Sequence, residues 1–273
     1  MTVRVHDLVA YPLKGCAGTS LDSAELTATG VAHDRELMLV EPGGEFLSQR
    51  KEPLMAALRP RLLDDGERLV VTAPRGGDLE HDLADGPRVP VSVHAWHGEG
   101  VDQGDAAAEW FSAALGRPCR LVRVPPEQRR ESGGDTPGLV GFADAHAVLV
   151  TSLASLDGLN ERIVARGGRP VPMNRFRPNV VLSGVAEPHG EDLAARLVVG
   201  GVELGRAKIC VRCAVPMVDQ DTGTRSGPEP IRTLATYRRG TGGGVTFGWK
   251  AAVVTGGRIS RGDEVDVVGD RSA

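Results

Sequence analysis

Short apolar runs separated by turn residues dominate the first hundred residues of the chain. Residues 3–10 alternate apolar and polar side chains with a period of two, as a strand with one buried face does. Residues 36–40 form an apolar run, which the turn sequence Glu41-Pro-Gly-Gly44 closes. Further strands are expected at 58–63, 68–72 and 89–96. Short strands at nearly regular spacing predict a barrel or a closed sheet.

The pattern becomes helical between residues 105 and 115. We expect Asp105 to cap this helix and Gly116 to end it. The apolar positions recur at helical spacing, which predicts an amphipathic helix: Ala107, Trp110, Phe111 and Ala114. A second helix is expected from Ser152 to about Arg166.

The second half of the chain returns to strands after a polar interruption. Residues 125–137 are rich in Pro and Gly, which predicts a mobile loop or a linker between two lobes. Later strands are expected at 147–150, 178–182, 197–199, 202–204 and 263–268. Residues 245–249 and 251–255 are interpreted as a hairpin pair. The whole pattern predicts a mixed α/β, β-dominated protein with two or three helices.

Composition adds few constraints to this pattern. The chain holds 36 glycines, about twice the usual share, which favours tight turns and short strands. A net charge of −4 argues against a general nucleic-acid binder. Of the 32 basic residues, all are arginines except Lys14, Lys51, Lys208 and Lys250. Biased codon usage explains this most simply, but each lysine is worth locating in the structure.

The sequence predicts a cytoplasmic protein. The N-terminus has neither an apolar core segment nor a small-residue cleavage site, as an export signal would. No apolar run approaches the roughly 20 residues of a membrane helix. The four cysteines are too few for a disulfide framework, which favours reduced thiols: Cys16, Cys119, Cys210 and Cys213.

The segment Cys210-Val-Arg-Cys213 is the sharpest local motif. A C-x-x-C pair is a zinc half-site, a redox dithiol, one functional thiolate, or simply buried structural cysteine. Zinc would need two further ligands at regular spacing, and no second pair follows. A thioredoxin-like site would need the motif at a helix N-terminus, whereas here it follows a strand-like segment. The motif alone leaves the functional thiolate and the structural cysteine open.

The surroundings of this motif favour a functional thiolate. Arg206, Lys208 and Arg212 flank it, and positive charge lowers the pKa of a thiol. A thiolate in basic surroundings suits a soft metal or an anionic cofactor. The polar turn at residues 218–223 follows and is expected to wrap such a site.

Several motifs in order resemble the MOSC (molybdenum cofactor sulfurase C-terminal) family, and more specifically its amidoxime-reducing branch. Cys-x-Arg-Cys followed by Val-Asp-x-Asp-Thr-Gly is the first of them. The others are Tyr11-Pro-Leu-Lys-Gly15, Gly30-Val-Ala-His-Asp-Arg35, Gln49-Arg-Lys-Glu-Pro53, Phe142-Ala-Asp144, Arg175-Phe-Arg-Pro-Asn179, Glu229 to Arg238 and Phe247-Gly248. The resemblance implies an N-terminal β-barrel-like domain over residues 1–124 and a MOSC β-barrel domain over 125–273.

The resemblance also implies a cofactor and its binding residues. The family holds a molybdenum–molybdopterin cofactor, and the residue matching its metal ligand is Cys213, whereas Cys210 is expected to be a packing residue. The positions that match cofactor-binding residues are Lys14, Gly15, Arg35, Asp144, Arg177, Asn179 and Val211. Arginine and lysine suit a phosphate, and the Asp144 carboxylate suits pterin N–H donors. Cys213 and Asp144 are the expected catalytic residues.

Some of these positions depart from the family pattern. Gly15 stands where amidoxime-reducing relatives often have serine, and Ala145 and Val211 replace small hydroxyl residues. Substrate preference therefore cannot be transferred directly. Asp34 beside Arg35 also offers that arginine a simple surface pair.

The reaction implied by the resemblance is reduction of N-oxygenated compounds. Electrons must then come from a separate ferredoxin- or flavoprotein-like donor, because the chain has no C-x₄-C-x₂-C set for an iron–sulfur cluster. We also expect no fused ferredoxin module, no nucleic acid and no membrane partner. A sulfur or cofactor carrier and a non-catalytic cofactor-binding protein remain the alternatives.

Overall fold

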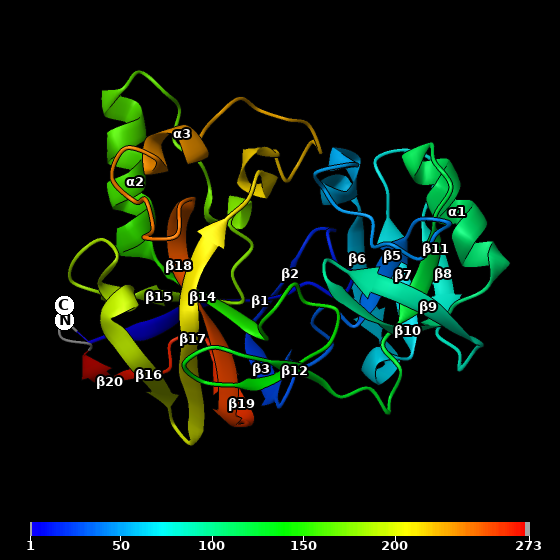
Figure 1. Cartoon of the computed structure of the whole chain (residues 1–273), viewed down its shortest axis with the longest axis horizontal. Coiled ribbons are helices and arrows are strands. Elements are labelled where there is room, and N and C mark those ends of the chain that lie inside the picture. The colour runs from blue at the N-terminus through cyan, green and yellow to red at the C-terminus, as the bar shows by residue number, and fades with distance from the viewer. Residues whose placement is uncertain (1, 271–273) are drawn as a thin grey trace.

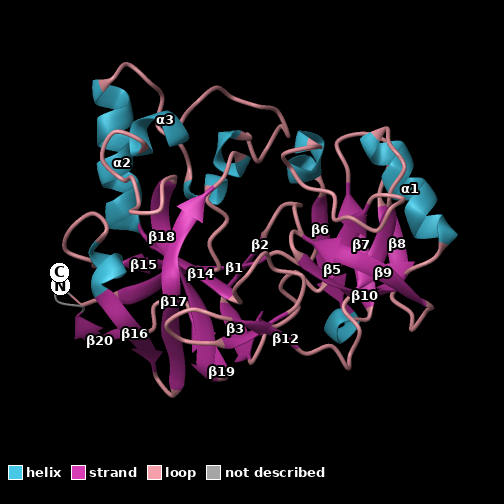
Figure 2. Cartoon of the chain, viewed as in Figure 1, coloured by secondary structure: helices cyan, strands magenta, loops and turns pink. Residues whose placement is uncertain are grey.

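The computed structural model describes residues 2–270 and consists of two β-rich lobes side by side (Figure 1). Strands hold 41% of the residues and helices 17%, which confirms the β-dominated fold expected from the sequence (Figure 2). Each lobe has its own apolar core. Leu37, Phe111 and Leu121 belong to the core of the smaller lobe, and Leu8, Val150 and Trp249 to that of the larger one.

The smaller lobe is built mainly from residues 37–123. Its four-stranded antiparallel sheet has the order β5 (Leu37–Val40), β11 (Arg120–Arg123), β10 (Trp96–Asp102) and β9 (Arg88–Val93). A second sheet has the order β6 (Arg59–Leu63), β7 (Arg68–Thr72) and β8 (Leu79–Asp82). Helix α1 (Asp105–Leu115) packs its buried Ala107 and Phe111 into this core. Short 3₁₀ helices lie at Pro53–Ala57 and Asp64–Gly66.

The larger lobe contains an eight-stranded sheet. Its order is β2 (Thr19–Leu21), β1 (Arg4–Ala10), β15 (Val180–Ser183), β14 (Val148–Ser152), β18 (Val245–Thr255), β17 (Val202–Arg212), β16 (Ala194–Val199) and β20 (Asp266–Asp270). The sheet curls round on itself, because Val5 N–H donates to the Asp263 carbonyl (2.9 Å) and Val265 N–H to the Val3 carbonyl (2.9 Å). The segment before β20 thus meets the start of β1, as in a barrel.

Smaller elements surround this sheet. Three strands pair beside it in the order β19 (Gly257–Ser260), β3 (Ser23–Thr27) and β4 (Gly30–Val31). Helix α2 (Leu153–Ala165) and the short α3 (Ile231–Leu234) pack together over a core in which Phe176 and Phe247 stack, 3.8 Å between ring centres. Further 3₁₀ helices lie at Met173–Arg175, Gly190–Leu193 and Val215–Met217.

The N-terminal strand belongs to the larger lobe. β1 pairs with β15, and Val5, Leu8 and Ala10 lie in the same core as Trp249. A domain boundary at residue 124 therefore stays a prediction, since residues from both sides of it share one sheet. Between β1 and β2 the chain enters the smaller lobe, where Leu13 and Cys16 lie in its core. It leaves the large lobe again after β4 and returns to it after β11.

Three local predictions were wrong. The cap of α1 is Gly104, with φ +86°, whereas Asp105 lies inside the first turn and pairs with Arg120 (2.9 Å). The segment 125–137 does connect the two lobes, but it is not a loop throughout, because it contains β12 (Arg130–Ser132), which pairs with β13 (Gly138–Val140). The buried Arg130 orders this hairpin by donating to the Ala143 carbonyl (2.7 Å).

The expected late hairpin is also wrong, because residues 245–255 form the single strand β18. Lys250 lies between the two segments that were expected to form the hairpin. In the structure it pairs with Leu149 of β14 on one side and with Lys208 of β17 on the other. A residue paired on both sides lies in the middle of a sheet.

None of the helices in the described part of the chain is long and apolar enough to cross a membrane.

Candidate functional site

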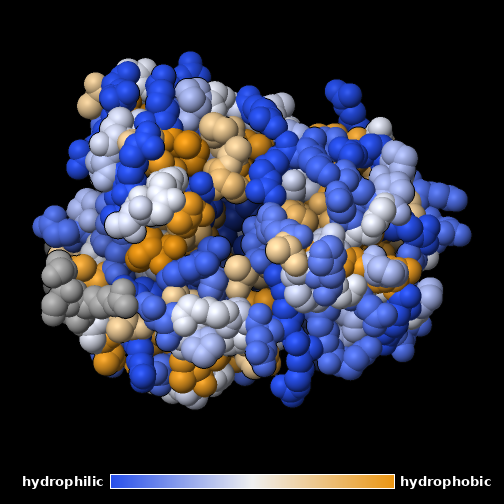
Figure 3. Space-filling model, viewed as in Figure 1, coloured by the Kyte–Doolittle hydropathy of each residue, from blue (hydrophilic) through white to orange (hydrophobic). Residues whose placement is uncertain are grey.

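A cavity opens between the two lobes and is lined by residues from both. It encloses about 920 Å³ of empty space, counting its solvent-open mouth. The smaller lobe and the segments leading to it contribute Lys14, Gly15, Arg35 and Arg50, and the larger lobe contributes Asp144, Arg177, Asn179, Val211 and Cys213. Figure 3 shows the surface hollowed between the lobes, with mainly hydrophilic residues around the opening. All the site residues expected from the sequence therefore line one cavity.

The two cysteines of the C-x-x-C motif lie in different environments. Cys210, within β17, is 3% exposed, and Arg212 Nη1 donates to its sulfur (3.1 Å). Cys213 follows the last residue of β17, is exposed, and lines the cavity. The motif forms the end of β17 and precedes only a short 3₁₀ helix, so it does not stand at the N-terminus of an α-helix as a thioredoxin-like site would.

The basic residues around this motif do not all surround Cys213. Arg206 is buried and donates to the Asp192 carbonyl (2.5 Å), near Asp135 (3.8 Å). Arg212 contacts Cys210 and the Phe176 carbonyl (2.7 Å). The expectation that Arg206 would act on the thiol was wrong, since its guanidinium is held elsewhere.

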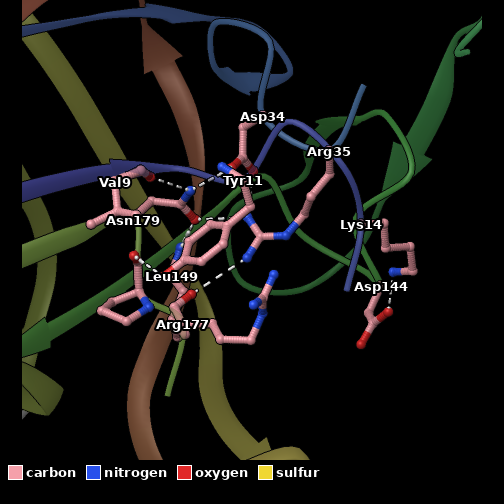
Figure 4. A network of polar contacts seen from close by, with 10 residues as sticks. Val9, Tyr11, Lys14, Asp34, Arg35, Asp144, Leu149, Arg177 and Asn179 are labelled. Carbon is pink, nitrogen blue, oxygen red and sulfur yellow. Dashed lines mark hydrogen bonds and ion pairs between the residues drawn. The ribbon is translucent and has the colours of Figure 1, made fainter. Parts of the chain in front are cut away.

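Lys14 and Asp144 form an ion pair across the cavity (Figure 4). Burial lowers the pKa of Lys14, and the charge of Asp144 opposes this. Burial would raise the pKa of Asp144, but the charge of Lys14 and a contact with His94 Nε2 (3.5 Å) hold it well below its usual range. The Asp144 side chain is 53% exposed, so an ionised carboxylate is open to a ligand.

Arg35 is held by a buried network. It has φ +51° and pairs with Asp34, whose side chain is only 1% exposed. Its Nη1 also donates to Asn179 Oδ1 (3.1 Å), and its Nη2 to the Arg177 carbonyl (3.4 Å). The expected surface pair of Arg35 and Asp34 is thus a buried pair, in which removal of either partner would leave an unpaired charge.

Asn179 is the centre of this network (Figure 4). Its Nδ2 donates to the Val9 carbonyl (3.1 Å) and to Asp34 Oδ1 (2.9 Å). Its Oδ1 accepts from Leu149 N–H (3.1 Å) as well as from Arg35. These four bonds use the full capacity of the amide. Asn179 therefore positions Arg35 beside the cavity.

Arg177 is a buried cation of the site with no carboxylate partner among residues 2–270. It is 8% exposed, has φ +57°, and lies over the Tyr11 ring, 4.2 Å from its centre. Burial lowers the pKa of Arg177 to about 10. Its Nη1 donates to Gln220 Oε1 (3.2 Å), but its buried Nη2 has no hydrogen-bond partner. An orphaned buried donor on a cation indicates a place for an anion.

Tyr11 and Gln220 are structural parts of the site that single-residue reasoning missed. Tyr11 lies within a family motif, but it is not among the predicted cofactor-binding residues. A tyrosine beside an apolar strand is usually a residue of the hydrophobic core. Gln220 is buried and exchanges two 3.1 Å hydrogen bonds with Gln49, which joins the two lobes. The polar turn around Gln220, expected to wrap the site, is held by Asp219, which accepts from Thr222 N–H (3.0 Å).

The departures from the family pattern lie at the cavity. Gly15 has φ +86°, and a Cβ on it would lie 2.8 Å from Met55 Cε. Its carbonyl accepts from Gln49 Nε2 (2.6 Å). Val211 is 57% exposed at the cavity mouth, and Ala145 lines the wall. The hydroxyl groups missing at these positions leave this part of the wall short of hydrogen-bond donors.

The cavity carries an excess of positive charge. Lys14 has Asp144 and Arg35 has Asp34 as partner. Among residues 2–270, no carboxylate lies within ion-pair distance of the other cations that line it: Arg50, Arg177, Arg212 and Lys250. The same range holds no group of three His, Cys, Asp or Glu side chains arranged around a metal site. The arrangement suits an anionic ligand. Any metal bound here would need most of its ligands from that molecule and not from the protein.

Two family models match successive parts of the chain. The model of the MOSC N-terminal beta barrel domain matches residues 2–118, and that of the MOSC domain matches residues 137–266. The mouse (Mus musculus) mitochondrial amidoxime-reducing component 1 is 35% identical over 248 residues, which cover 86% of this chain and 71% of that protein. The human (Homo sapiens) protein of the same name is 32% identical, over 97% of this chain and 83% of that protein.

A second kind of relative matches the same residues. The molybdenum cofactor sulfurase of rice (Oryza sativa subsp. japonica) is 33% identical over 261 residues. The match covers 88% of this chain and 31% of the sulfurase, so this chain corresponds to about a third of that protein.

Proposed function

The chain belongs to the MOSC family, and from this membership we propose that it is a molybdenum-cofactor-dependent reductase of N-hydroxylated compounds. The proposal includes Cys213 as the metal ligand, and Lys14, Arg35 and Arg177 as the residues that bind the pterin and its phosphate. Gly15, Asn179 and Val211 shape the same wall, and Asp144 faces the ligand as an acceptor.

The observation that carries the proposal is that an exposed thiol and an unneutralised buried guanidinium open into one cavity. Cys213 gives a single soft ligand, as a metal already bound by a dithiolene requires. Arg177 offers a buried Nη2 with no partner, as a phosphate requires. The Cys213 thiolate thus fits the metal end of the cofactor, and the Arg177 guanidinium fits its phosphate end.

When bound, the cofactor supplies the two electrons that reduce the N–O bond. The balanced reaction is R–NHOH + 2 e⁻ + 2 H⁺ → R–NH₂ + H₂O. The chain binds and orients the reactants: Arg177 holds the phosphate, and the Asp144 carboxylate accepts hydrogen bonds from N–H groups. Because the pKa of Asp144 is held low, this carboxylate keeps no proton at neutral pH and serves as an acceptor.

The electrons in this proposal come from a separate ferredoxin- or flavoprotein-like donor. Such a donor would have to approach the cavity mouth, where Val211 and Cys213 are exposed. A cytoplasmic location is part of the proposal. All four cysteines are free thiols, as is usual in a reducing compartment.

Metal analysis tests the proposal directly. The protein is purified from a host that makes molybdenum cofactor, and wild type is compared with Cys213→Ala and with Cys16→Ala as a buried-cysteine control. We expect about one molybdenum per wild-type and Cys16→Ala chain, and little in Cys213→Ala. Equal metal in all three samples would rule out Cys213 as the ligand. Absence of benzamidoxime reduction by molybdenum-loaded protein with an artificial electron donor would rule out the reductase.

The exposure of Cys213 and the similarity to the sulfurase favour one second candidate, a sulfur carrier. In this role the Cys213 thiol holds a persulfide that it passes on. Mass spectrometry would then show a reducible adduct of about +32 Da on Cys213. The reductase predicts stoichiometric metal and no such adduct.

A further inference from the structure

Two lysines face each other across β17 and β18 beside the cavity. Lys208 and Lys250 are direct partners in the antiparallel pairing, so their side chains leave the same face of the sheet. No carboxylate among the described residues lies within ion-pair distance of either one, although the other two lysines each have such a partner. Like charges directly opposite each other destabilise a sheet. An anion between the two ammonium groups would relieve this repulsion, and no carboxylate of the described residues supplies it.

His146 provides an independent observation at the same place. It is 9% exposed and lines the cavity together with Lys250, and its Nδ1 has no hydrogen-bond partner. Its Nε2 donates to the Gly133 carbonyl (3.0 Å), which leaves Nδ1 as the unprotonated nitrogen. Burial, assisted by the charges of Lys250 and Lys208, lowers the pKa of His146 to about 4. The imidazole is thus a neutral acceptor within the field of both lysines.

The placement of the lysines is not explained by codon usage. Only four of the 32 basic residues are lysines. Lys14 and Lys250 line the cavity, and Lys208 lies opposite Lys250. Lys51 is the exception, because it pairs with Glu41 (2.8 Å) on the surface. Biased codon usage explains many arginines, but not that two of the four lysines line one cavity and a third lies opposite one of them.

We propose that Lys208 and Lys250 form an anion subsite for the substrate, beside the hydrogen-bond acceptor His146. Preferred substrates would then carry a carboxylate or phosphate group in addition to the N-hydroxylated group. The subsite rests on the proposed function, because it adds a second recognition point to the same cavity. It uses residues of β17, β18 and the segment before β14, whereas the cofactor phosphate is assigned to Arg177, on the segment before β15. The ammonium groups act as point charges that attract the anion, whereas His146 Nδ1 is an acceptor and would take a hydrogen bond from an N–H or O–H group of the same ligand.

Binding without turnover tests the subsite. Isothermal titration calorimetry is carried out on oxidised, cofactor-loaded protein in the absence of an electron donor. The probes are benzamidoxime, 4-carboxybenzamidoxime and 4-phosphonobenzamidoxime, which share the N-hydroxylated group and differ in charge. We expect wild type to bind at least one anionic probe about tenfold more tightly than the neutral one. The two anionic probes distinguish a carboxylate subsite from a phosphate subsite.

Lysine variants show whether the preference for anionic probes depends on Lys208 and Lys250. The double variant Lys208→Gln/Lys250→Gln should lose the preference for the anionic probe. Lys250→Arg, which keeps the charge, and Lys51→Gln, which removes a surface charge, should retain it. Thermal unfolding of each variant verifies that it folds, and Lys250→Gln alone replaces the double variant if that one does not.

Each outcome has a defined meaning. Equal affinities of wild type for neutral and anionic probes would overturn the subsite, and so would a preference that survives in the double variant. If none of the three probes binds, the proposed function fails and the subsite fails with it.

Discussion

The guanidinium of Arg177 and the ring of Tyr11 are 4.2 Å apart, in a contact that links the segment before β15 to the end of β1. Arg35 lies over the same ring at 4.7 Å, and the Tyr11 hydroxyl donates to the Pro178 carbonyl (3.1 Å). Burial raises the pKa of Tyr11 to about 12, so the ring stays neutral. One buried ring thus holds two cations that repel each other, and it fixes the positive end of the cavity.

Replacing this ring should weaken cofactor retention. Tyr11→Phe keeps the cation–π contacts and loses one buried hydrogen bond, so we expect a loss of about 1 kcal/mol in the free energy of unfolding and near-normal molybdenum content. Tyr11→Leu removes the contacts as well, and its molybdenum content should fall several-fold. Urea denaturation and metal analysis measure the two effects. Equal metal content in both variants would show that the ring does not position Arg177.

Arg177→Met should separate cofactor binding from stability. The buried guanidinium has no carboxylate partner in the described part of the chain, so Gln220 and the Tyr11 ring compensate its desolvation only in part in the cofactor-free protein. We expect the cofactor-free variant to gain about 1–3 kcal/mol in the free energy of unfolding over cofactor-free wild type. The same variant should retain little cofactor. A destabilised cofactor-free variant would contradict this account.

Acid should destabilise the protein through the buried His146 and the half-buried His189. Burial lowers the pKa of His146 and of His189 to about 4 each, below the value near 6.5 of an unfolded chain. Between these values the unfolded state binds more protons, so the free energy of unfolding falls as the pH drops from about 6.5 to about 4. His189→Asn suits the φ of +67° at this position and should reduce that slope. Urea denaturation at several pH values measures it, and an unchanged slope would contradict the prediction.

Repulsion between Lys208 and Lys250 should lower the free energy of unfolding. Lys250→Gln removes one of two like charges that face each other, so the free energy of unfolding should rise by about 0.2–1 kcal/mol in low salt. The gain should shrink in high salt, because ions screen exposed charges. Lys51→Gln is the control, since it loses surface ion pairs and should leave stability equal or slightly lower. A loss of stability in Lys250→Gln would argue that the lysine has a partner.

Gly223 fixes the turn that carries Gln220 against the smaller lobe. It has φ +65°, and a Cβ on it would lie 2.8 Å from Leu54 Cα. Gly223→Ala should therefore lose about 2 kcal/mol or more in the free energy of unfolding and should lower cofactor content by shifting Gln220. Gly200→Ala has a similar φ of +57° with nothing within 4 Å of the new Cβ. It should lose only about 1 kcal/mol, and equal losses would show that the contact with Leu54 is unimportant.

Local patterns predicted those elements whose burial follows one simple period. The alternation at 3–10 and the helical spacing at 105–115 correspond to β1 and α1, because each element buries one face. The predictions from local pattern were wrong where contacts with distant segments determine the secondary structure. Residues 245–255 were expected to form a hairpin, yet strands pair with Lys250 on both sides and hold it in the middle of β18. Arg130 sat in a polar stretch, but distant carbonyls and the Trp96 ring order it into a hairpin.

For the site, the sequence by itself determined which residues are present and the order of the family motifs, and hence the family. It also predicted different roles for Cys213 and Cys210, both of which line the cavity, and the structure leaves Cys213 exposed and Cys210 buried. Only the tertiary structure decided the electrostatics. Arg35 is neutralised by a buried Asp34, Arg177 is not neutralised, and Lys208 lies opposite Lys250. The reason is physical: the charge state and the free hydrogen-bonding groups of a side chain depend on what surrounds it, and those neighbours come from strands distant in sequence.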